Sequence, residues 1–269
     1  MTDRTPRLET VGAWMLAILW LAPILFALWA AIHPPEYLTR FDPFAPVTLD
    51  NFRRAFAAAP FARYMLNTAI LVTGILIAQF ILCTLAAYAF ARWRFPGSGL
   101  LFALVLMQLM VAPEILMVQN YATVSRLGLL DSLAGIAAPY VASAFGIFLL
   151  RQTFRQVPKE LEDAAVIEGA GPLTVLWRVY VPLAKPVYVA YGLVSVSFHW
   201  NNFLWPLIVT SSVSTRPVTV GLQVFASVDQ GIDWAVISAA ALATSAPLLI
   251  AFLLFQRAFV QSFMRAGIR

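Results

Sequence analysis

The sequence predicts an all-α membrane protein with six transmembrane helices, and two observations carry that prediction. Of its 269 residues, 61% are hydrophobic and only 12% are charged, and the mean hydropathy is +0.80. Soluble domains carry about a quarter charged residues, so lipid must be the solvent for most of this chain. A bilayer-crossing helix takes about 20 apolar residues. Six stretches qualify: 11–32, 66–91, 99–118, 132–150, 187–210 and 235–255.

The first stretch follows a short polar N-terminus and runs too long, without a small-residue cleavage signal, for a removable signal peptide. We therefore expect a retained span. The next segment, 33–65, is rich in Pro and aromatic residues, and Asp50 is predicted to cap a short amphipathic helix over 51–58 at the outer interface. Cys83 is the one cysteine, which excludes an intrachain disulfide and a cysteine metal cluster, and we expect a buried apolar role for it.

Orientation follows from the basic residues, because cytoplasmic loops carry the excess of Lys and Arg. Twelve of the 18 basic residues fall in the N-terminus, 92–98, 151–186 and the tail from 256. Six fall in 33–65, 119–131 and 211–234. Both termini are thus predicted to be cytoplasmic, and the net charge of +5 reflects this bias. No basic run with interleaved aromatics is present, so we expect no nucleic-acid partner.

An acidic stretch, ELEDAAVIEGAGP at 160–172, is unusual in so apolar a chain. Pro158 stands where a helix would begin, and acids fill its first turn, where the helix dipole favours negative charge. Gly169 and Gly171 supply stop signals. This pattern predicts a short exposed helix of about ten residues.

Pro172 is predicted to open a second short helix, which Pro182 and Pro186 end before the fifth span. We call the whole inner segment 156–182 the elbow. Its small residues Ala164, Ala165 and Gly169 would let another protein approach closely while the acids stay in water. A solvated connector, whose acids only keep it out of the membrane, is an equally open reading. Nothing near the acids suggests a catalytic site or a metal site.

The fifth span carries polar residues, which are costly in lipid and usually face a bundle interior or a cavity. Helical spacing puts one set on a single face: Tyr191, Ser195, His199, Asn202 and Pro206. We predict that this stripe lines a pathway for a solute. The alternative is simple hydrogen bonding between helices, worth about 1 kcal/mol per residue. Trp200 and Phe203 are expected to pack elsewhere, and Asn201 to meet a neighbouring helix.

The third span contributes weaker candidates. Glu114 follows Pro113, which is expected to bend the helix, and lies near the predicted outer end of the span, where a charge is tolerable. It is a candidate contact for a solute or gate, or a half-exposed turn. Gln108 and Gln119, eleven residues apart, are spaced to share a helix face.

Residues 161–186, LEDAAVIEGAGPLTVLWRVYVPLAKP, resemble the cytoplasmic "EAA" signature of the permease subunits of binding-protein-dependent ABC importers. That signature runs EAA, three residues, Gly, nine residues and Ile-x-Leu-Pro. The matching positions are Asp163, Ala164, Ala165, Gly169, Val179, Val181 and Pro182. Asp163 replaces the first Glu and the two valines replace Ile and Leu, so charge and apolarity are kept.

Other segments are similar to the carbohydrate, maltose-permease-like branch of that family. They are LNTAI at 66–70, AAYAFARWRFPG at 86–97, FLLRQTFRQVPKEL at 148–161, WNNFLWPLIVT at 200–210 and LLFQRAFVQ at 253–261. The tail SFMRAGIR lacks the Gly that often follows FVQ. The resemblance implies the MetI-like permease fold, a single transmembrane domain over 1–269, and a place in the bacterial cytoplasmic (inner) membrane.

The resemblance also implies partners: a second similar permease, two cytoplasmic ATPase subunits and a periplasmic or extracellular solute-binding protein. The elbow would be the coupling segment that docks on one ATPase. Its implied coupling residues are Glu160, Glu162, Asp163, Ala164, Ala165, Gly169, Pro172 and Pro182. The sequence holds no G-x-x-x-x-G-K-[ST] motif, so no cofactor is expected on this chain, and ATP and Mg²⁺ would belong to the ATPase subunits.

The implied solute is a sugar, a polyol or a related compound. Glycerol phosphate or a glycerophosphodiester is the alternative; a phosphate would favour an Arg near the path, and the predicted spans contain none. An ion-coupled secondary transporter is an alternative from a different class of protein. Such transporters often have inverted repeats with broken helices, and the elbow would have no function in one. A membrane enzyme would need a convergent set of titratable residues, which the spans lack.

Overall fold

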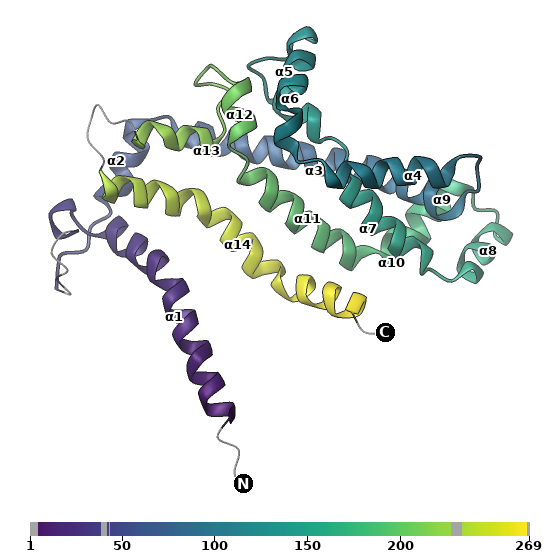
Figure 1. Cartoon of the computed structure of the whole chain (residues 1–269), viewed down its shortest axis with the longest axis horizontal. Helices are drawn as coiled ribbons and strands as arrows, with labels where there is room; N and C mark the ends of the chain where they lie inside the picture. The colour runs from purple at the N-terminus through teal and green to yellow at the C-terminus, as the bar shows by residue number, and fades with distance from the viewer. Residues whose placement is uncertain (1–4, 39–41, 43, 227–232, 268–269) are drawn as a thin grey trace. The chain divides into compact units, whose positions relative to one another are not determined.

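The computed structural model describes residues 5–38, 42, 44–226 and 233–267, and all regular structure in these ranges is helical (Figure 1). The all-α prediction is confirmed for this part of the chain. The chain folds as two compact units, each formed by two separate stretches of sequence. Unit 1 comprises Met1–Met65 and Val218–Pro247, and unit 2 comprises Leu66–Pro217 and Leu248–Arg269.

Three predicted spans are confirmed as single helices long and apolar enough to cross a bilayer. They are α1 (Thr5–Ile32), α3 (Phe61–Arg92) and α14 (Trp234–Gly267). Three bent helix pairs pass the same test, so the described residues hold up to six spans by length and composition. The third, fourth and fifth predicted stretches are therefore not single straight helices, because each is interrupted by a bend or a short non-helical segment.

The third stretch breaks at a proline. α4 (Ser98–Met107) and the 3₁₀ turn η2 (Gln108–Met110) end before a bend of 98°, and η3 (Pro113–Leu116) leads into α5 (Met117–Arg126). Ala112 is extended, with ψ 134°. The ring of a proline disfavours helical geometry in the preceding residue, so Pro113 ends the helix that the apolar run alone predicts.

The fourth stretch divides into α6 (Leu133–Ala137) with the 3₁₀ turn η4 (Ala138–Tyr140), and α7 (Ala144–Arg155), bent by 48°. Ser143 starts α7, because its hydroxyl accepts a hydrogen bond from the backbone N–H of Gly146 at 3.2 Å. This is an ordinary N-cap, which satisfies a donor that the new helix leaves free.

In the fifth stretch, α11 (Lys185–Trp200) and α12 (Leu204–Val209) are separated by residues 201–203. Pro206 has no N–H to donate to the carbonyl of Asn202, which weakens a continuous helix here. A second bend, of 77°, lies at Ala184, between the helical residues Pro172–Leu183 and α11.

Unit 1 also contains η1 (Pro35–Tyr37), α2 (Asp50–Ala58), α13 (Val218–Gly221) and η6 (Leu222–Ala226). The short helix predicted over 51–58 is confirmed. Asp50 does not cap it, however: it is the first helical residue, and its own N–H donates to the hydroxyl of Thr48. The buried Asn51 amide instead donates to the carbonyls of Ala31 and His33, and so fastens α2 to the end of α1.

Unit 2 has two apolar clusters, and α7 packs against α4 and α11 (Figure 1). One cluster lies near the start of α3 and includes Leu71, Ile75 and Trp205. The other surrounds the end of α3 and includes Phe154 and Tyr180. Cys83 is fully buried, as predicted.

Candidate functional site

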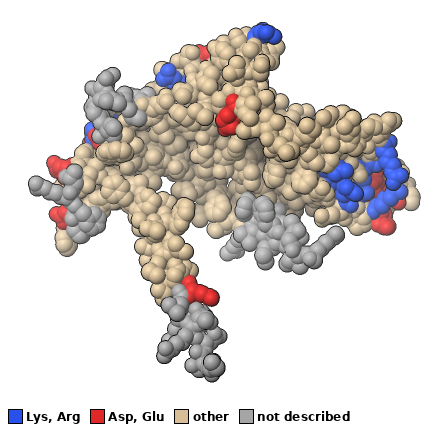
Figure 2. Space-filling view, in the orientation of Figure 1, with Lys and Arg blue, Asp and Glu red and all other residues tan. Residues whose placement is uncertain are grey.

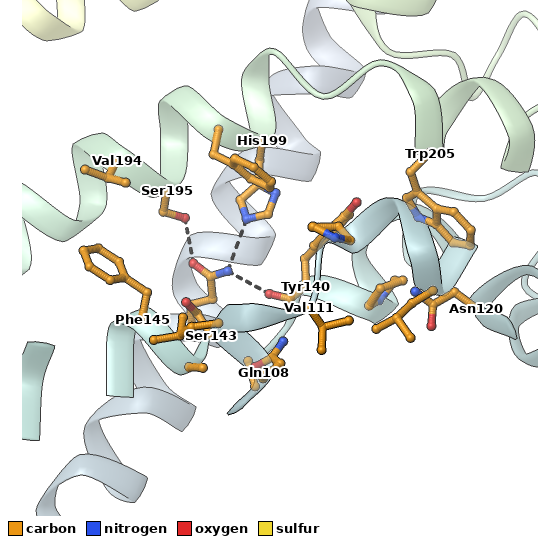
Figure 3. Close-up of a pocket in the computed structure, with 18 of the residues that line it drawn as sticks. Gln108, Val111, Asn120, Tyr140, Ser143, Phe145, Val194, Ser195, His199 and Trp205 are labelled. Carbon is orange, nitrogen blue, oxygen red and sulfur yellow. Dashed lines mark hydrogen bonds between the residues drawn. The ribbon is translucent and has the colours of Figure 1, made fainter. Parts of the chain in front are cut away.

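A cavity of about 330 Å³ lies within unit 2, among α3, α11, α12 and the bends of the third and fourth stretches (Figure 3). Its polar lining residues are Gln79, Gln108, Asn120, Tyr140, Ser143, Tyr191, Ser195 and His199. Aromatic rings add to the lining, among them Phe145, Phe198 and Trp205. Among the described residues that line this cavity there is no Lys, Arg, Asp or Glu.

The side chain of Gln79 joins the polar groups of the cavity. Its Oε1 accepts hydrogen bonds from the hydroxyls of Tyr191 at 2.8 Å and Ser195 at 2.6 Å. Its Nε2 donates to the carbonyl of Tyr140 at 2.8 Å and lies 3.2 Å from Nε2 of His199. Gln79 is only 3% exposed, so one buried amide ties α3 to α11 and to η4 in the fourth stretch. Dashed lines in Figure 3 mark hydrogen bonds that end at Ser195, His199 and Tyr140.

This network assigns the tautomer of His199. A carbonyl oxygen can only accept, so the Gln79 atom next to the Tyr140 carbonyl must be the amide nitrogen. That nitrogen donates to His199 Nε2 as well, which makes Nε2 an acceptor and leaves the ring proton on Nδ1. Nδ1 is buried and has no hydrogen-bond partner within the described residues. An unpaired buried donor costs about 1–3 kcal/mol.

Three members of the predicted stripe, Tyr191, Ser195 and His199, are buried and meet at this cavity. Asn202 lies beyond the end of α11 and is not a lining residue; its amide donates to the hydroxyl of Tyr140 at 2.9 Å. The helical face used in the prediction does not extend past Trp200, because α11 ends there.

Other expectations for these segments differ from the structure. Glu114 is exposed in η3 and is not among the lining residues, which agrees with the half-exposed turn. The amide of Asn201 donates to the carbonyl of Ser197 in its own helix, so the prediction of a partner on a neighbouring helix is wrong. The 98° bend separates Gln108 from Gln119, and their predicted common face is wrong as well.

Gln79 and Tyr140 are the residues that sequence reasoning missed. Gln79 is the one amide in the apolar run 71–83, LVTGILIAQFILC, and a polar residue inside a span is a functional candidate by default. That signal could have found it. Tyr140 enters the network through its backbone carbonyl, for which the sequence carries no signal.

The elbow forms the two predicted short helices. α8 (Lys159–Ile167) begins directly after Pro158, and Gly169, at φ +84°, ends it in the left-handed conformation that favours glycine. α9 (Pro172–Val175) opens the second helix, which continues through a π-helical turn (Leu176–Tyr180) and α10 (Val181–Leu183). Pro182 lies inside α10 and does not end it, contrary to the prediction; the break falls at Ala184.

The elbow turns part of its acidic face inward. Glu160, Asp163, Ala164 and Gly169 are exposed, as expected. Glu162 is partly buried, and its carboxylate accepts a hydrogen bond from the Tyr180 hydroxyl at 2.6 Å, so the expectation that every acid stays in water is wrong. The reason is the 3.6-residue helical period, which points residues 162 and 163 in different directions.

Ala165 also packs against the apolar core of unit 2 and not on the outer face. The large exposed apolar side chains of the elbow are Leu161, Val166, Ile167, Leu173 and Trp177. Charged side chains gather over the end of unit 2 that carries α8 and α9 (Figure 2). Exposed apolar and acidic groups thus alternate on one surface. Within the described residues, no group of three or more His, Cys, Asp and Glu side chains is placed to hold a metal ion.

Residues 11–265 match the family described as "Binding-protein-dependent transport system inner membrane component", and the chain belongs to that family. It is 30% identical, over 97% of its own length and 98% of the relative's, to the sn-glycerol-3-phosphate transport system permease protein UgpE of Shigella flexneri serotype 5b (strain 8401). The protein of that name from Pectobacterium atrosepticum is 34% identical over 75% of this chain and 72% of its own length.

Two solved structures share the fold. A bacterial ABC transporter involved in the import of the acidic polysaccharide alginate aligns with a TM-score of 0.86 at 23% identity, over 96% of this chain and 99% of that chain. A bacterial alginate ABC transporter in complex with an alginate pentasaccharide-bound periplasmic protein aligns with a TM-score of 0.68 at 14% identity, over 94% and 96%. This protein is a permease component of a binding-protein-dependent ABC importer of the inner membrane.

Proposed function

We propose that the importer carries an uncharged sugar or polyol and that the solute passes through the cavity around Gln79. The observation that supports this solute is the chemistry of the lining, in which amide, hydroxyl and imidazole groups stand among aromatic rings without a charged side chain. Small-molecule sites commonly combine apolar walls with a few fixed polar groups. Hydroxyl groups of a solute can both donate to and accept from such a set.

sn-Glycerol 3-phosphate is the second candidate, because relatives that align with nearly the whole chain carry that name. A phosphate group calls for an Arg or Lys contact. None belongs to the described lining of this cavity, so on this reading the second permease or the binding protein would supply the cation.

Calorimetry on the cognate solute-binding protein distinguishes the two solutes. We expect binding of neutral sugars or polyols and no competition from glycerol phosphates. The matched transport test is uptake of the bound compound by cells with and without this permease. Tight binding and permease-dependent uptake of glycerol phosphate alone would reject the neutral solute.

The elbow is proposed to dock on a partner ATPase and to transmit its movement. Support comes from the exposed surface of α8 and α9, where acids such as Asp163 alternate with apolar groups such as Ile167, which is 86% exposed. In this proposal two ATPase subunits hold ATP and Mg²⁺, and a second similar permease completes the pathway. Both termini lie in the cytoplasm, residues 1–269 act as one transmembrane domain, and nucleotide-driven closure changes which side of the membrane has access.

Gly169 allows a sharp test of docking. Gly169→Asp is expected to abolish association with the ATPase and import while membrane insertion is retained. Because Gly169 has φ +84°, part of that effect would be backbone strain. Gly169→Asn is the matched control, since Asn tolerates the left-handed region. Solute-stimulated ATP hydrolysis at the normal rate in Gly169→Asp would overturn the docking role of the elbow.

A separate test addresses the class of transporter. Solute transport by the purified chain alone, driven by an ion gradient, would favour a secondary transporter.

A further inference from the structure

Arg92, the last residue of α3, is paired with Glu162 of α8. Nε of Arg92 lies 3.3 Å from Oε2 of Glu162, within ion-pair distance but without hydrogen-bond geometry, and the two side chains are only 15% and 22% exposed. The guanidinium also donates from Nη2 to the carbonyl of Val157 at 2.6 Å, just before the elbow helices. One cation thus holds the end of a transmembrane helix against the backbone and a side chain of the elbow.

Tyr180 completes the contact from the second half of the elbow. Its hydroxyl donates to the same Glu162 oxygen, and its ring centroid lies 4.9 Å from the guanidinium carbon of Arg92, within the range of a cation–π contact. Tyr180 is fully buried and packs against Phe154 and Tyr88. The Glu162 carboxylate is therefore shared by α3 and both halves of the elbow.

These contacts make Glu162 unsuitable as a docking group. Its partners belong to its own chain, whereas Glu160 and Asp163 on the same helix are exposed and free to meet another protein's surface. A shielded ion pair is also screened less by salt than an exposed pair. Loss of either partner leaves an uncompensated charge in a partly buried position.

We propose that Arg92 and Glu162 form a mechanical link, positioned by Tyr180, that makes α3 follow the elbow when the elbow moves. Gln79 lies thirteen residues before Arg92 on the same helix, about 20 Å along its axis. A shift of α8 would thereby reach the polar network of the cavity through one continuous helix. The contact between Arg92 and Glu162 does not depend on the proposed function. Its role in coupling does, because that role rests on the proposed docking of the elbow.

Spin labels test the link itself in the full-length chain, with and without the ATPase subunits. We place them at exposed positions outside the proposed docking residues, Arg94 and Lys159, as Arg94→Cys and Lys159→Cys in a Cys83→Ala background. Glu162→Gln should broaden the distance distribution between the labels. Glu160→Gln, a matched change on the exposed side of the same helix, should leave it narrow.

The charge reversal Arg92→Glu with Glu162→Arg should narrow the distribution again, and Glu162→Asp should keep it close to the starting width. Indistinguishable distributions for Glu162→Gln and Glu160→Gln would overturn the link. So would a charge reversal that restores nothing, because the effect of Glu162→Gln would then be general destabilisation.

The functional arm measures solute imported per ATP hydrolysed in proteoliposomes that contain the complete transporter. Glu162→Gln should lower this ratio about tenfold while ATP hydrolysis continues, because coupling between distant sites is typically worth about 5- to 150-fold. Co-purification of the ATPase should be unchanged. If Glu162→Gln releases the ATPase, then Glu162 is a docking residue and the inference fails. If the unsubstituted chain binds no ATPase, the proposed function fails, and the label distances still decide the link.

Discussion

Nε2 of Gln79 in α3 lies 3.2 Å from Nε2 of His199 in α11, although the two residues are 120 positions apart in the chain. The same Gln79 nitrogen donates to the Tyr140 carbonyl, so His199 must accept on Nε2 and carry its proton on Nδ1. This Nδ1–H is buried and has no hydrogen-bond partner within the described residues; if the solute passes through the cavity as proposed, it is the donor that His199 has left to offer. A hydrogen-bond network between helices thus sets the chemistry that the cavity offers.

Gln79→Leu should destabilise the protein by about 1–3 kcal/mol, because the buried hydroxyls of Tyr191 and Ser195 lose their acceptor. Thermal unfolding in detergent measures the effect. Gln119→Leu is the control, since Gln119 is exposed. Equal midpoints for the two variants would mean that the network contributes nothing to stability.

His199→Phe should raise the KM for import about tenfold, because one hydrogen bond to the solute contributes about 1 kcal/mol or slightly more. Solute-independent ATP hydrolysis should not change. Ser197→Ala, on the same helix but outside the lining, serves as the control. An unchanged KM in His199→Phe would remove His199 from the solute pathway.

Gly146→Ala should disturb the cavity by crowding Tyr191. A Cβ at position 146 would lie 2.7 Å from Cζ of Tyr191 and 3.1 Å from Sγ of Cys83. Overpacking of this kind costs about 1–3 kcal/mol. Gly74→Ala, where a Cβ meets nothing within 4 Å, should be neutral or slightly stabilising. The idea fails if both substitutions shift the unfolding midpoint alike.

Asp131, outside the predicted spans, provides a pH test. The Thr215 hydroxyl, at 2.6 Å, and the backbone N–H groups of Ser212 and Ser211 donate to its carboxylate and hold its pKa well below the usual value. A lowered folded-state pKa stabilises the protein above the unfolded pKa of about 4, and this stabilisation declines as pH falls below it. Between about pH 5 and pH 3, the unfolding midpoint should therefore fall more in the unsubstituted protein than in Asp131→Asn.

Asn is the suitable replacement because Asp131 has φ 55°, a conformation that Asn tolerates and Ala does not. Parallel pH curves for the two proteins would contradict this role of the carboxylate.

Much of the fold could be predicted from the sequence. Apolar length alone located α1, α3 and α14, and the Pro and Gly pattern predicted α8 and the start of α9. The bend expected at Pro113 is a full break at Ala112, whereas hydropathy did not locate the break after Trp200, although Pro206 was visible. Hydropathy measures whether a segment prefers lipid; it does not report how the backbone bends within that segment.

The residues of the candidate site, too, could be predicted from the sequence only in part. Tyr191, Ser195 and His199 could be predicted because they recur on one face of a single helix. Gln79 carried a visible signal as an isolated amide in an apolar run, but its partner Tyr140 did not, because a backbone carbonyl is common to every residue type.

The sequence by itself determined the class of protein: its hydropathy requires a membrane, and the spacing from Asp163 to Gly169 and Pro182 matches the signature of importer permeases. Only the tertiary structure decided that Glu162 turns inward to Arg92 and that Gln79 assigns the proton of His199. The physical reason is the separation along the chain over which each effect acts. Solvent preference and helical period act within a segment, whereas ion pairs and hydrogen bonds between segments depend on the folding that brings distant residues to within about 3 Å.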